Sequence, residues 1–129
     1  KRDAIVRRAV DGFRIKVADV ERSVATLSGG NQQKALVARW MERRPRVLIL
    51  DEPTRGIDVG ARKEMFAILR ALVEDGMAVL LISSDLSEVI HMSHRIAIYR
   101  DGRILRTVEA GEMDAQEIME LLTGASHAV

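Results

Sequence analysis

The feature that most constrains the fold is a run of four apolar residues, Val47 to Leu50, followed directly by two acids. Pro45 and Pro53 bracket this run and limit it to the length of a strand, and its β-branched content favours a strand over a helix. A continuous apolar run, rather than an alternating one, is typical of a strand buried on both faces of a parallel sheet. We therefore expect an α/β fold with this strand inside it.

Asp51 and Glu52 follow the predicted strand at its C-terminal end. In open α/β sheets, ligands bind beyond the carboxyl ends of the strands. Adjacent carboxylates at a buried edge are costly unless a metal, hydrogen bonds or a function offset them. The alternative is a solvated acidic turn, and these residues alone leave both interpretations open.

A second feature is the triplet Ser28, Gly29 and Gly30, which precedes a helix predicted over Gln32 to Arg44. Ser28 is a natural N-cap, whereas each glycine costs about 0.5–1 kcal/mol relative to alanine in a helix. The glycines would let an anion approach bare backbone N–H groups at the positive end of the helix. The alternative is a capped helix with a flexible entry. The apolar face of this helix is predicted to consist of Leu36, Val37, Trp40 and Met41, with Trp40 in the core.

The segments on either side of these two features predict further elements of an α/β domain. Lys1 to Val10 is compatible with a short helix, and Phe13 to Val17 alternates like an extended segment. Asp58 can cap a helix that Gly76 ends, and Met77 to Ile82 is a second apolar strand. A strand, a helix and a second strand in this order predict a right-handed crossover between parallel strands. The apolar positions of the crossover helix are Met65, Ile68, Leu69, Leu72 and Val73.

The C-terminal third predicts two capped helices around a hairpin. Asp85 with Glu88, and Asp114 with Glu117, have the spacing of capping boxes. Asp101-Gly102 is a two-residue hairpin turn between strands. The apolar positions of these strands and of the last helix, which Gly124 ends, are Ile96, Ile98, Ile104, Val108, Ile118, Leu121 and Leu122.

Composition bounds the class of protein. The 129 residues are 47% hydrophobic and 30% charged, as in a soluble globular domain, and the net charge of +1 gives no reason to expect nucleic acid. The longest apolar run, Met77 to Ile82, is far shorter than the ~20 residues of a membrane span. The absence of cysteine fits a cytosolic protein. The chain begins with Lys1, as an excised segment would.

Three motifs in order, LSGGNQQK, VLILDEP and RGID, resemble the nucleotide-binding domain of ABC transporters. They look most like the C-terminal ATP-binding half of the ATPase subunits of bacterial ribose, galactose and xylose importers. The resemblance covers Leu27 to Gly124. It implies part of a P-loop NTPase core, with parallel strands, crossover helices and a C-terminal hairpin and helix. Residues 1–26 would be the tail of the helical subdomain, 27–124 the C-terminal part of the ATPase core, and 125–129 a frayed tail.

The resemblance also implies roles for individual residues in ATP hydrolysis. Asp51 would hold Mg²⁺, and Glu52 would orient or deprotonate the attacking water. Ser28, Gly29 and Gly30 would cover the γ-phosphate of an ATP molecule held by the opposite domain of a head-to-tail pair. Asn31, Gln32, Gln33 and Lys34 extend this signature motif. The remaining nucleotide-binding positions by resemblance are Asn31, Gln32, Asp58, in the loop that joins the two sites, and Ser84.

Two departures from the family pattern are evident. The P-loop G-x-x-x-x-G-K-[ST] is absent from these residues, so that the chain alone should bind ATP weakly or not at all. Ser84 stands where the family has a switch histidine, and serine cannot carry charge or reach a phosphate in the same way. We therefore expect an asymmetric pair, in which this half contributes its signature to the active site of its partner.

The sequence thus predicts the C-terminal portion of the ATP-binding subunit of a sugar importer. The expected partners are a second ATP-binding domain, transmembrane permease subunits and, indirectly, a periplasmic sugar-binding protein, without nucleic acid. The expected location is the cytoplasmic face of the bacterial inner membrane. Two alternatives stay open: a soluble ATPase of the same superfamily that acts on DNA or ribosomes, and a regulatory dimerisation module without hydrolysis. The sequence does not identify the sugar.

Overall fold

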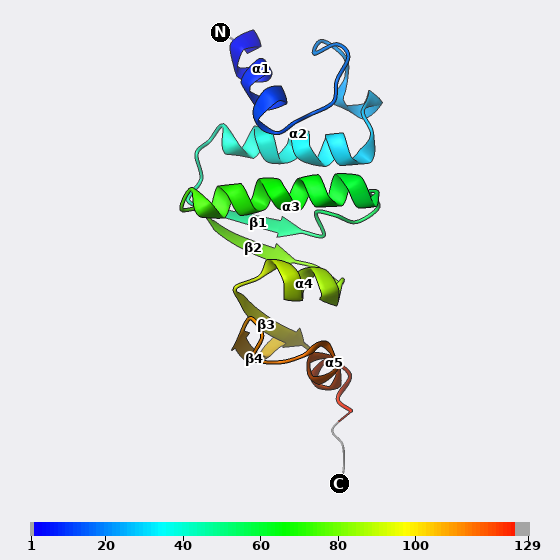
Figure 1. Cartoon of the computed structure of the whole chain (residues 1–129), viewed down its shortest axis with the longest axis vertical. Helices are drawn as coiled ribbons and strands as arrows, with labels where there is room; N and C mark the ends of the chain where they lie inside the picture. The colour runs from blue at the N-terminus through cyan, green and yellow to red at the C-terminus, as the bar shows by residue number, and fades with distance from the viewer. Residues whose placement is uncertain (1, 126–129) are drawn as a thin grey trace. The chain divides into compact units, whose positions relative to one another are not determined.

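The computed structural model describes residues 2–125, which divide into two compact units between Leu80 and Leu81 (Figure 1). Each unit combines helices with a two-stranded sheet, and the predicted α/β class is confirmed. Of the predicted frayed tail, residues 126–129 lie outside the described part of the chain.

The first unit is built around a crossover between parallel strands. Its strand β1 (Val47–Asp51) pairs with β2 (Ala78–Ile82), and α3 (Val59–Glu74) connects them, as predicted (Figure 1). Helix α2 (Gly29–Met41) packs against α3. Before α2 come α1 (Arg2–Gly12) and a short 3-10 helix, η1 (Val24–Thr26). The buried core of this unit consists of Val37, Leu48, Met65 and Leu69.

The sheet of the first unit is buried on one face, whereas burial on both faces was predicted. Leu48 is 6% exposed and packs in the core, but its neighbours Val47 and Ile49 are 57% and 63% exposed. Leu80 on β2 is also exposed. The reason is geometric: successive side chains of a strand point to opposite faces, and α3 accounts for the covered face.

The inward face of α2 also differs from the prediction. Leu36 and Trp40 are 50% and 56% exposed, so that the placement of Trp40 in the core is wrong. A helix turns 100° per residue, and residues four or seven positions after Gly30 return to the side that Gly30 presents to α3. The buried residues of α2 are accordingly Gly30, Lys34, Val37 and Ala38.

Two boundaries differ from the sequence prediction. Helix α2 ends at Met41 instead of Arg44, and Arg44 adopts a left-handed backbone (φ 51°) before Pro45. The predicted extended segment at Phe13 is instead a closing turn of α1, in which the Ile15 N–H donates to the Val10 carbonyl. Alternating apolar residues are compatible with the C-terminal end of a helix as well as with a strand, because the residues that cap a helix often make an apolar contact with its last turn.

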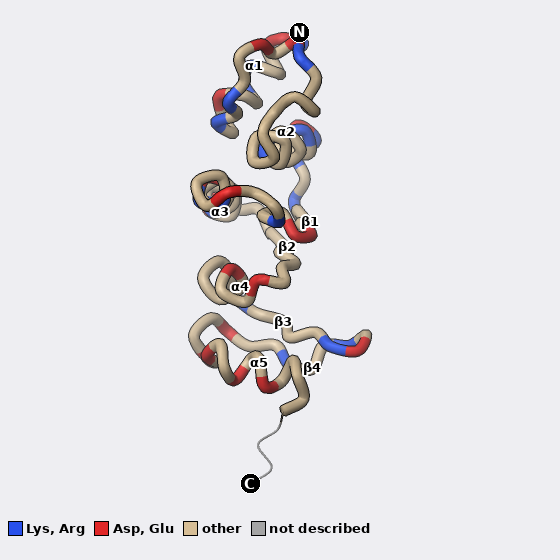
Figure 2. The backbone as a smooth tube through the Cα atoms, turned by 90° about the vertical axis from the view of Figure 1, so that its right-hand side faces the viewer, with Lys and Arg blue, Asp and Glu red and all other residues tan. Residues whose placement is uncertain are grey.

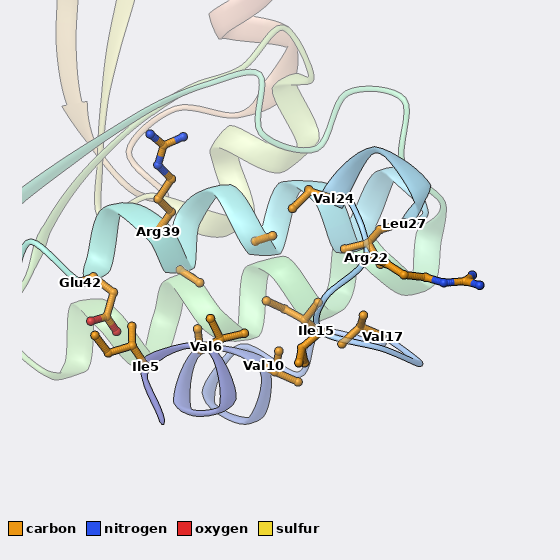
Figure 3. A pocket seen from close by; sticks show the side chains of 14 residues that line it. Ile5, Val6, Val10, Ile15, Val17, Arg22, Val24, Leu27, Arg39 and Glu42 are labelled. Atoms are coloured by element: carbon orange, nitrogen blue, oxygen red, sulfur yellow. The ribbon is translucent and has the colours of Figure 1, made fainter. Parts of the chain in front are cut away.

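An apolar cavity of about 310 Å³ lies between α1, the segment that follows it, and α2 (Figure 3). Val6 and Val10 of α1 face it on one side and Leu27 on the other. Helix α1 has no fully buried residue and contacts α2. Helix α1, which lies in the segment predicted to be the tail of the helical subdomain, is thus packed loosely on α2. Within residues 2–125, no helix has both the length and the apolar character needed to cross a membrane.

The second unit is a hairpin packed with two helices. Strands β3 (Arg95–Arg100) and β4 (Arg103–Glu109) pair antiparallel across Asp101-Gly102, and both turn residues have positive φ, as predicted. Helices α4 (Leu86–Met92) and α5 (Ala115–Thr123) contribute to its core. Ile104 is in the predicted strand but is 60% exposed. The buried core consists of Ile96, Ile98, Val108 and Ile118.

Candidate nucleotide-binding site

The signature turn, Ser28 to Gly30, forms the start of α2. Ser28 has an extended backbone and is the N-cap, and its Oγ accepts a hydrogen bond from the Asn31 N–H at 3.5 Å. Ser28 and Gly29 are exposed, and the first turn of α2 contains no acidic residue. The positive end of this helix is therefore accessible and is not neutralised by an acid of its own.

The surroundings of the two glycines in the signature turn differ. A Cβ atom at Gly30 would lie 2.4 Å from the Cβ of Ala61 on α3, so that only glycine fits at this crossing. A Cβ at Gly29 would meet Ile57 at 3.7 Å and the Gly56 carbonyl at 3.9 Å, which are ordinary contacts. The packing of α2 on α3 thus requires a glycine at Gly30. No contact requires a glycine at Gly29, where the missing side chain leaves the backbone N–H accessible.

Residues 56 and 57, which directly precede Asp58, lie beside this turn, because a Cβ atom at Gly29 would contact both. Asp58 caps the helix that follows. Its Oδ1 accepts a hydrogen bond from the Ala61 N–H at 2.8 Å, which caps α3 as predicted. Gly56 has φ 75°, a conformation that glycine adopts without strain, and it turns the chain toward α3. The fold therefore brings together two of the predicted elements, the signature turn and the RGID turn.

The acids after β1 occupy its carboxyl end, as predicted, and Figure 2 shows this end of the strand in red. Asp51 is exposed and ends the strand, whereas Glu52 is half-buried. Glu52 has φ 49°, an uncommon conformation for a residue with a side chain, and such strain clusters at functional sites. The turn then continues through Thr54, which is 3% exposed.

Asp51 is the residue predicted to hold a magnesium ion. The described residues contain no group of three or more His, Cys, Asp or Glu side chains that could hold a metal ion by themselves. Mg²⁺, however, is often bound by one or two carboxylates together with waters and substrate phosphates. Asp51 could supply one such carboxylate, and its binding of Mg²⁺ stays a prediction.

Asn31 and Gln32, both predicted to extend the signature, make specific contacts with the chain itself. The Asn31 amide accepts a hydrogen bond from the Lys16 N–H and donates one to Ser28 Oγ, each at 2.9 Å. The Gln32 amide donates to the Leu27 carbonyl at 2.8 Å. Both side chains thus hold the signature turn in place, and their contact with a nucleotide stays a prediction.

The sequence places Lys34 in the extended signature motif, but its burial was missed. Lys34 is 2% exposed, and its Nζ pairs with the Glu64 carboxylate of α3 and donates to the Arg14 carbonyl at 3.0 Å. The hydrogen bond and the charge of Lys34 hold the pKa of Glu64 below its usual value. The signal was present, since Lys34 is four residues after Gly30 and three before Val37, on the inward face of α2.

Ser84, predicted at the position of the switch histidine, lies in the second unit between β2 and α4 and is exposed. Next to it, Ser83 accepts a hydrogen bond from the Asp85 N–H and donates one to Glu88, each at 3.0 Å. Asp85 caps α4 as predicted, but Glu88 bonds to the Ser83 hydroxyl within this local network. The Ser83 hydroxyl thus accepts the hydrogen bond from the Asp85 N–H that, in a capping box, the Glu88 carboxylate would accept.

The family model described as "ABC transporter" matches residues 1–55, which include the signature turn and the acids. The chain is 49% identical, over 87% of its length, to a putative ribose/galactose/methyl galactoside import ATP-binding protein of Pseudomonas fluorescens. It is 48% identical, over 98% of its length, to a ribose import ATP-binding protein of Rubrobacter xylanophilus. The chain spans 22% and 26% of the length of these two relatives.

Solved structures share the fold. A putative metal-chelate type ABC transporter in an inward-facing conformation matches with a TM-score of 0.80 at 20% identity, over 94% of this chain and 48% of that one. A dimeric ATP-binding cassette bound to ADP and phosphate matches with a TM-score of 0.74 at 23% identity, over 87% of this chain and 48% of that one. Together with the identity to the sugar-import proteins and the family match, this fold identifies the chain as a segment of an ATP-binding cassette of the ABC transporter family.

Proposed function

We propose that this chain is the C-terminal portion of the ATP-binding subunit of a sugar importer, and that its signature turn completes an ATP site on a partner domain. The observation that carries this proposal is the exposed start of α2, where Ser28 and Gly29 lie beside the Gly56 turn without an acidic residue in the first helical turn. Such a helix start attracts phosphate. The sequence identity to ribose and galactose import ATP-binding proteins supports a sugar as the transported substrate.

The strand-end acids would serve a second ATP site in the full-length protein. Phosphoryl transfer needs a metal, stabilisation of charge and an oriented water. Asp51 would hold Mg²⁺, and Glu52 would orient the water. Because Ser84 replaces the histidine that the family resemblance implies, we propose that this second site hydrolyses ATP poorly and that the pair is asymmetric.

The partners follow from the same proposal. They are a second ATP-binding domain in a head-to-tail pair, and permease subunits in the bacterial inner membrane, on whose cytoplasmic face the subunit would lie. The dimeric cassette among the solved relatives supports the pairing. A periplasmic sugar-binding protein would deliver the sugar to the permease.

Paired substitutions in the full-length subunit test this asymmetry. Ser28→Arg would block the phosphate-facing turn, and we expect it to abolish ATP turnover, whereas Glu52→Gln should leave most of the turnover intact. Ala67→Arg is the matched control, because it adds the same side chain at an exposed position of α3. Loss of turnover with Glu52→Gln would contradict the asymmetry. Retention of turnover in both variants would instead favour a regulatory module.

The missing P-loop gives a separate test. Isothermal titration of this chain with Mg-ATP should show no binding tighter than about 1 mM, since no lysine and amide cradle is present for the β- and γ-phosphates. A micromolar affinity for Mg-ATP would contradict the proposal that another part of the protein holds the nucleotide.

A further inference from the structure

The side-chain amide of Asn31 lies between the backbone of the segment after α1 and the hydroxyl of the signature serine. Its Oδ1 accepts from the Lys16 N–H at 2.9 Å, and its Nδ2 donates to Ser28 Oγ at 2.9 Å. Asn31 is half-buried, while Ser28 is exposed. The amide therefore connects a fixed backbone position to a side chain at the protein surface.

The orientation of this amide follows from the chemistry of its partners. A backbone N–H can only donate, so that the Asn31 oxygen must face Lys16. The NH₂ group of the same amide must then face Ser28, and the serine oxygen is the acceptor. The Lys16 backbone thus decides which end of the Asn31 amide the serine meets.

This contact determines the direction of the serine proton. A hydroxyl oxygen has two acceptor lone pairs and one hydrogen. In Ser28, Oγ accepts from Asn31 Nδ2 at 2.9 Å and from the Asn31 backbone N–H at 3.5 Å. Because Oγ accepts from both of these groups, the hydroxyl hydrogen remains to donate to an external acceptor.

We propose that Asn31 is a positioning residue that turns the Ser28 hydroxyl into a donor aimed at the terminal phosphate of the bound nucleotide. The inference rests on the proposed function of the signature turn. Asn31 acts through Ser28 and does not itself touch the phosphate. A phosphate oxygen is an anionic acceptor, and hydrogen bonds to charged groups are stronger than neutral ones.

Asparagine is specific for this role because aspartate has the same shape and the opposite chemistry. In an Asn31→Asp variant, the carboxylate still accepts from the Lys16 N–H but cannot donate to Ser28. The serine hydroxyl then donates to the carboxylate, and its proton turns inward. An acid in the first turn of a helix is stabilising. Asn31→Asp should therefore not unfold the protein.

The experiment is a double-mutant cycle in the full-length subunit assembled with its partner subunits, with kcat and KM for ATP as readouts. Ser28→Ala and Asn31→Asp should each lower kcat/KM about tenfold, the loss expected for one hydrogen bond to a charged group. The double variant should lose clearly less than the product of the two single losses, since Asn31 acts through the hydroxyl and the added carboxylate contributes only a direct repulsion of the phosphate. The control Leu36→Glu adds the same charge at an exposed position of α2 outside the signature motif and should stay within about twofold of the wild type.

The results separate this inference from the proposed function. If the two losses multiply in the double variant, or if Leu36→Glu is as damaging as Asn31→Asp, the inference is overturned and the signature function stands. If Ser28→Ala has no effect on kcat/KM, the inference is also overturned, whereas the proposed function is overturned only if Ser28→Arg keeps full turnover. Thermal unfolding of Asn31→Asp should show an unchanged or higher midpoint, and a lowered midpoint would assign Asn31 a structural role instead.

Discussion

The first N–H groups of α2 and of α5 have no partner within the helix, and the side chains at the two helix starts differ in charge. Helix α5 begins with a complete capping box, in which the Asp114 carboxylate accepts from the Glu117 N–H and the Glu117 carboxylate accepts from the Asp114 N–H, each at 2.8 Å. Helix α2 begins with a neutral serine, two glycines and an asparagine. Acidic residues follow one another along α5 (Figure 2), while the first turn of α2 has none.

The two helix starts differ in whether their own side chains neutralise the end of the helix. Two carboxylates at the start of α5 satisfy its free N–H groups and compensate the positive end of its dipole. At α2, Ser28 accepts one backbone N–H, and the side chains of the first turn are uncharged. The α2 start can therefore attract an anion from another molecule, whereas the α5 start is already neutralised.

The most direct way to break this comparison is to give α2 the acid of α5. Ser28→Asp in the full-length subunit should lower ATP turnover on the order of a hundredfold, because a carboxylate replaces a donor and repels the phosphate. Thermal unfolding should change little, since aspartate and serine are similar N-caps. Turnover close to the wild type would show that the charge at this helix start does not matter.

The reciprocal change is the control. Asp114→Ser in α5 should leave ATP turnover unchanged, because this cap lies in the second unit and has no proposed ligand. A comparable loss of turnover in this variant would mean that both helix starts take part in the reaction.

The two glycines sharpen the comparison by steric means. Gly30→Ala should destabilise the chain by about 3 kcal/mol, because its Cβ would overlap that of Ala61 at 2.4 Å. Gly29→Ala meets only ordinary contacts and should be neutral or stabilising by up to ~1 kcal/mol. Urea unfolding of the two variants measures this difference. Equal stabilities would contradict the close crossing of α2 and α3.

The buried lysine predicts a pH dependence. The pKa of Glu64 is lowered from its ordinary value of 4.5, chiefly by the hydrogen bond and charge of Lys34. The corresponding stability is therefore present above pH 4.5 and is lost as the pH falls through the lower pKa of the folded state. Lys34→Met should cost about 2 kcal/mol at pH 7 and flatten this acid decline.

Lys63→Met is the control for this prediction, because it removes the same charge from an exposed position next to Glu64 in sequence. Unfolding midpoints measured between pH 3 and 7 should keep the acid decline in this variant. An unchanged decline in Lys34→Met would show that the ion pair does not contribute to stability.

The smallest expected effect belongs to the capping box of α5. Asp114→Ala should cost about 1 kcal/mol and increase hydrogen exchange at the Glu117 amide, which loses its acceptor. Gln116→Ala is the matched control, because Gln116 is an exposed residue in the same helical turn. Unchanged exchange at Glu117 would contradict the role of the box in holding the start of α5.

Local signals predicted most of the elements. The caps at Ser28, Asp58 and Asp114, the hairpin at Asp101-Gly102 and the strand before Asp51 are all found, because each depends on residues close together in the sequence. The errors concern which side of an element is covered. Trp40 and Ile49 are apolar but exposed, since burial depends on what packs against the element rather than on its own residue type.

The sequence by itself determined the order of strands and helices, their caps and the family, because motifs and turn chemistry act over a few residues. Only the tertiary structure decided that Gly30 is needed for a close approach to Ala61, that Lys34 is buried against Glu64, and that the Lys16 backbone meets the Asn31 amide. These contacts join residues that are 15 to 31 positions apart in the chain. Packing alone brings such residues together, and no local pattern specifies it.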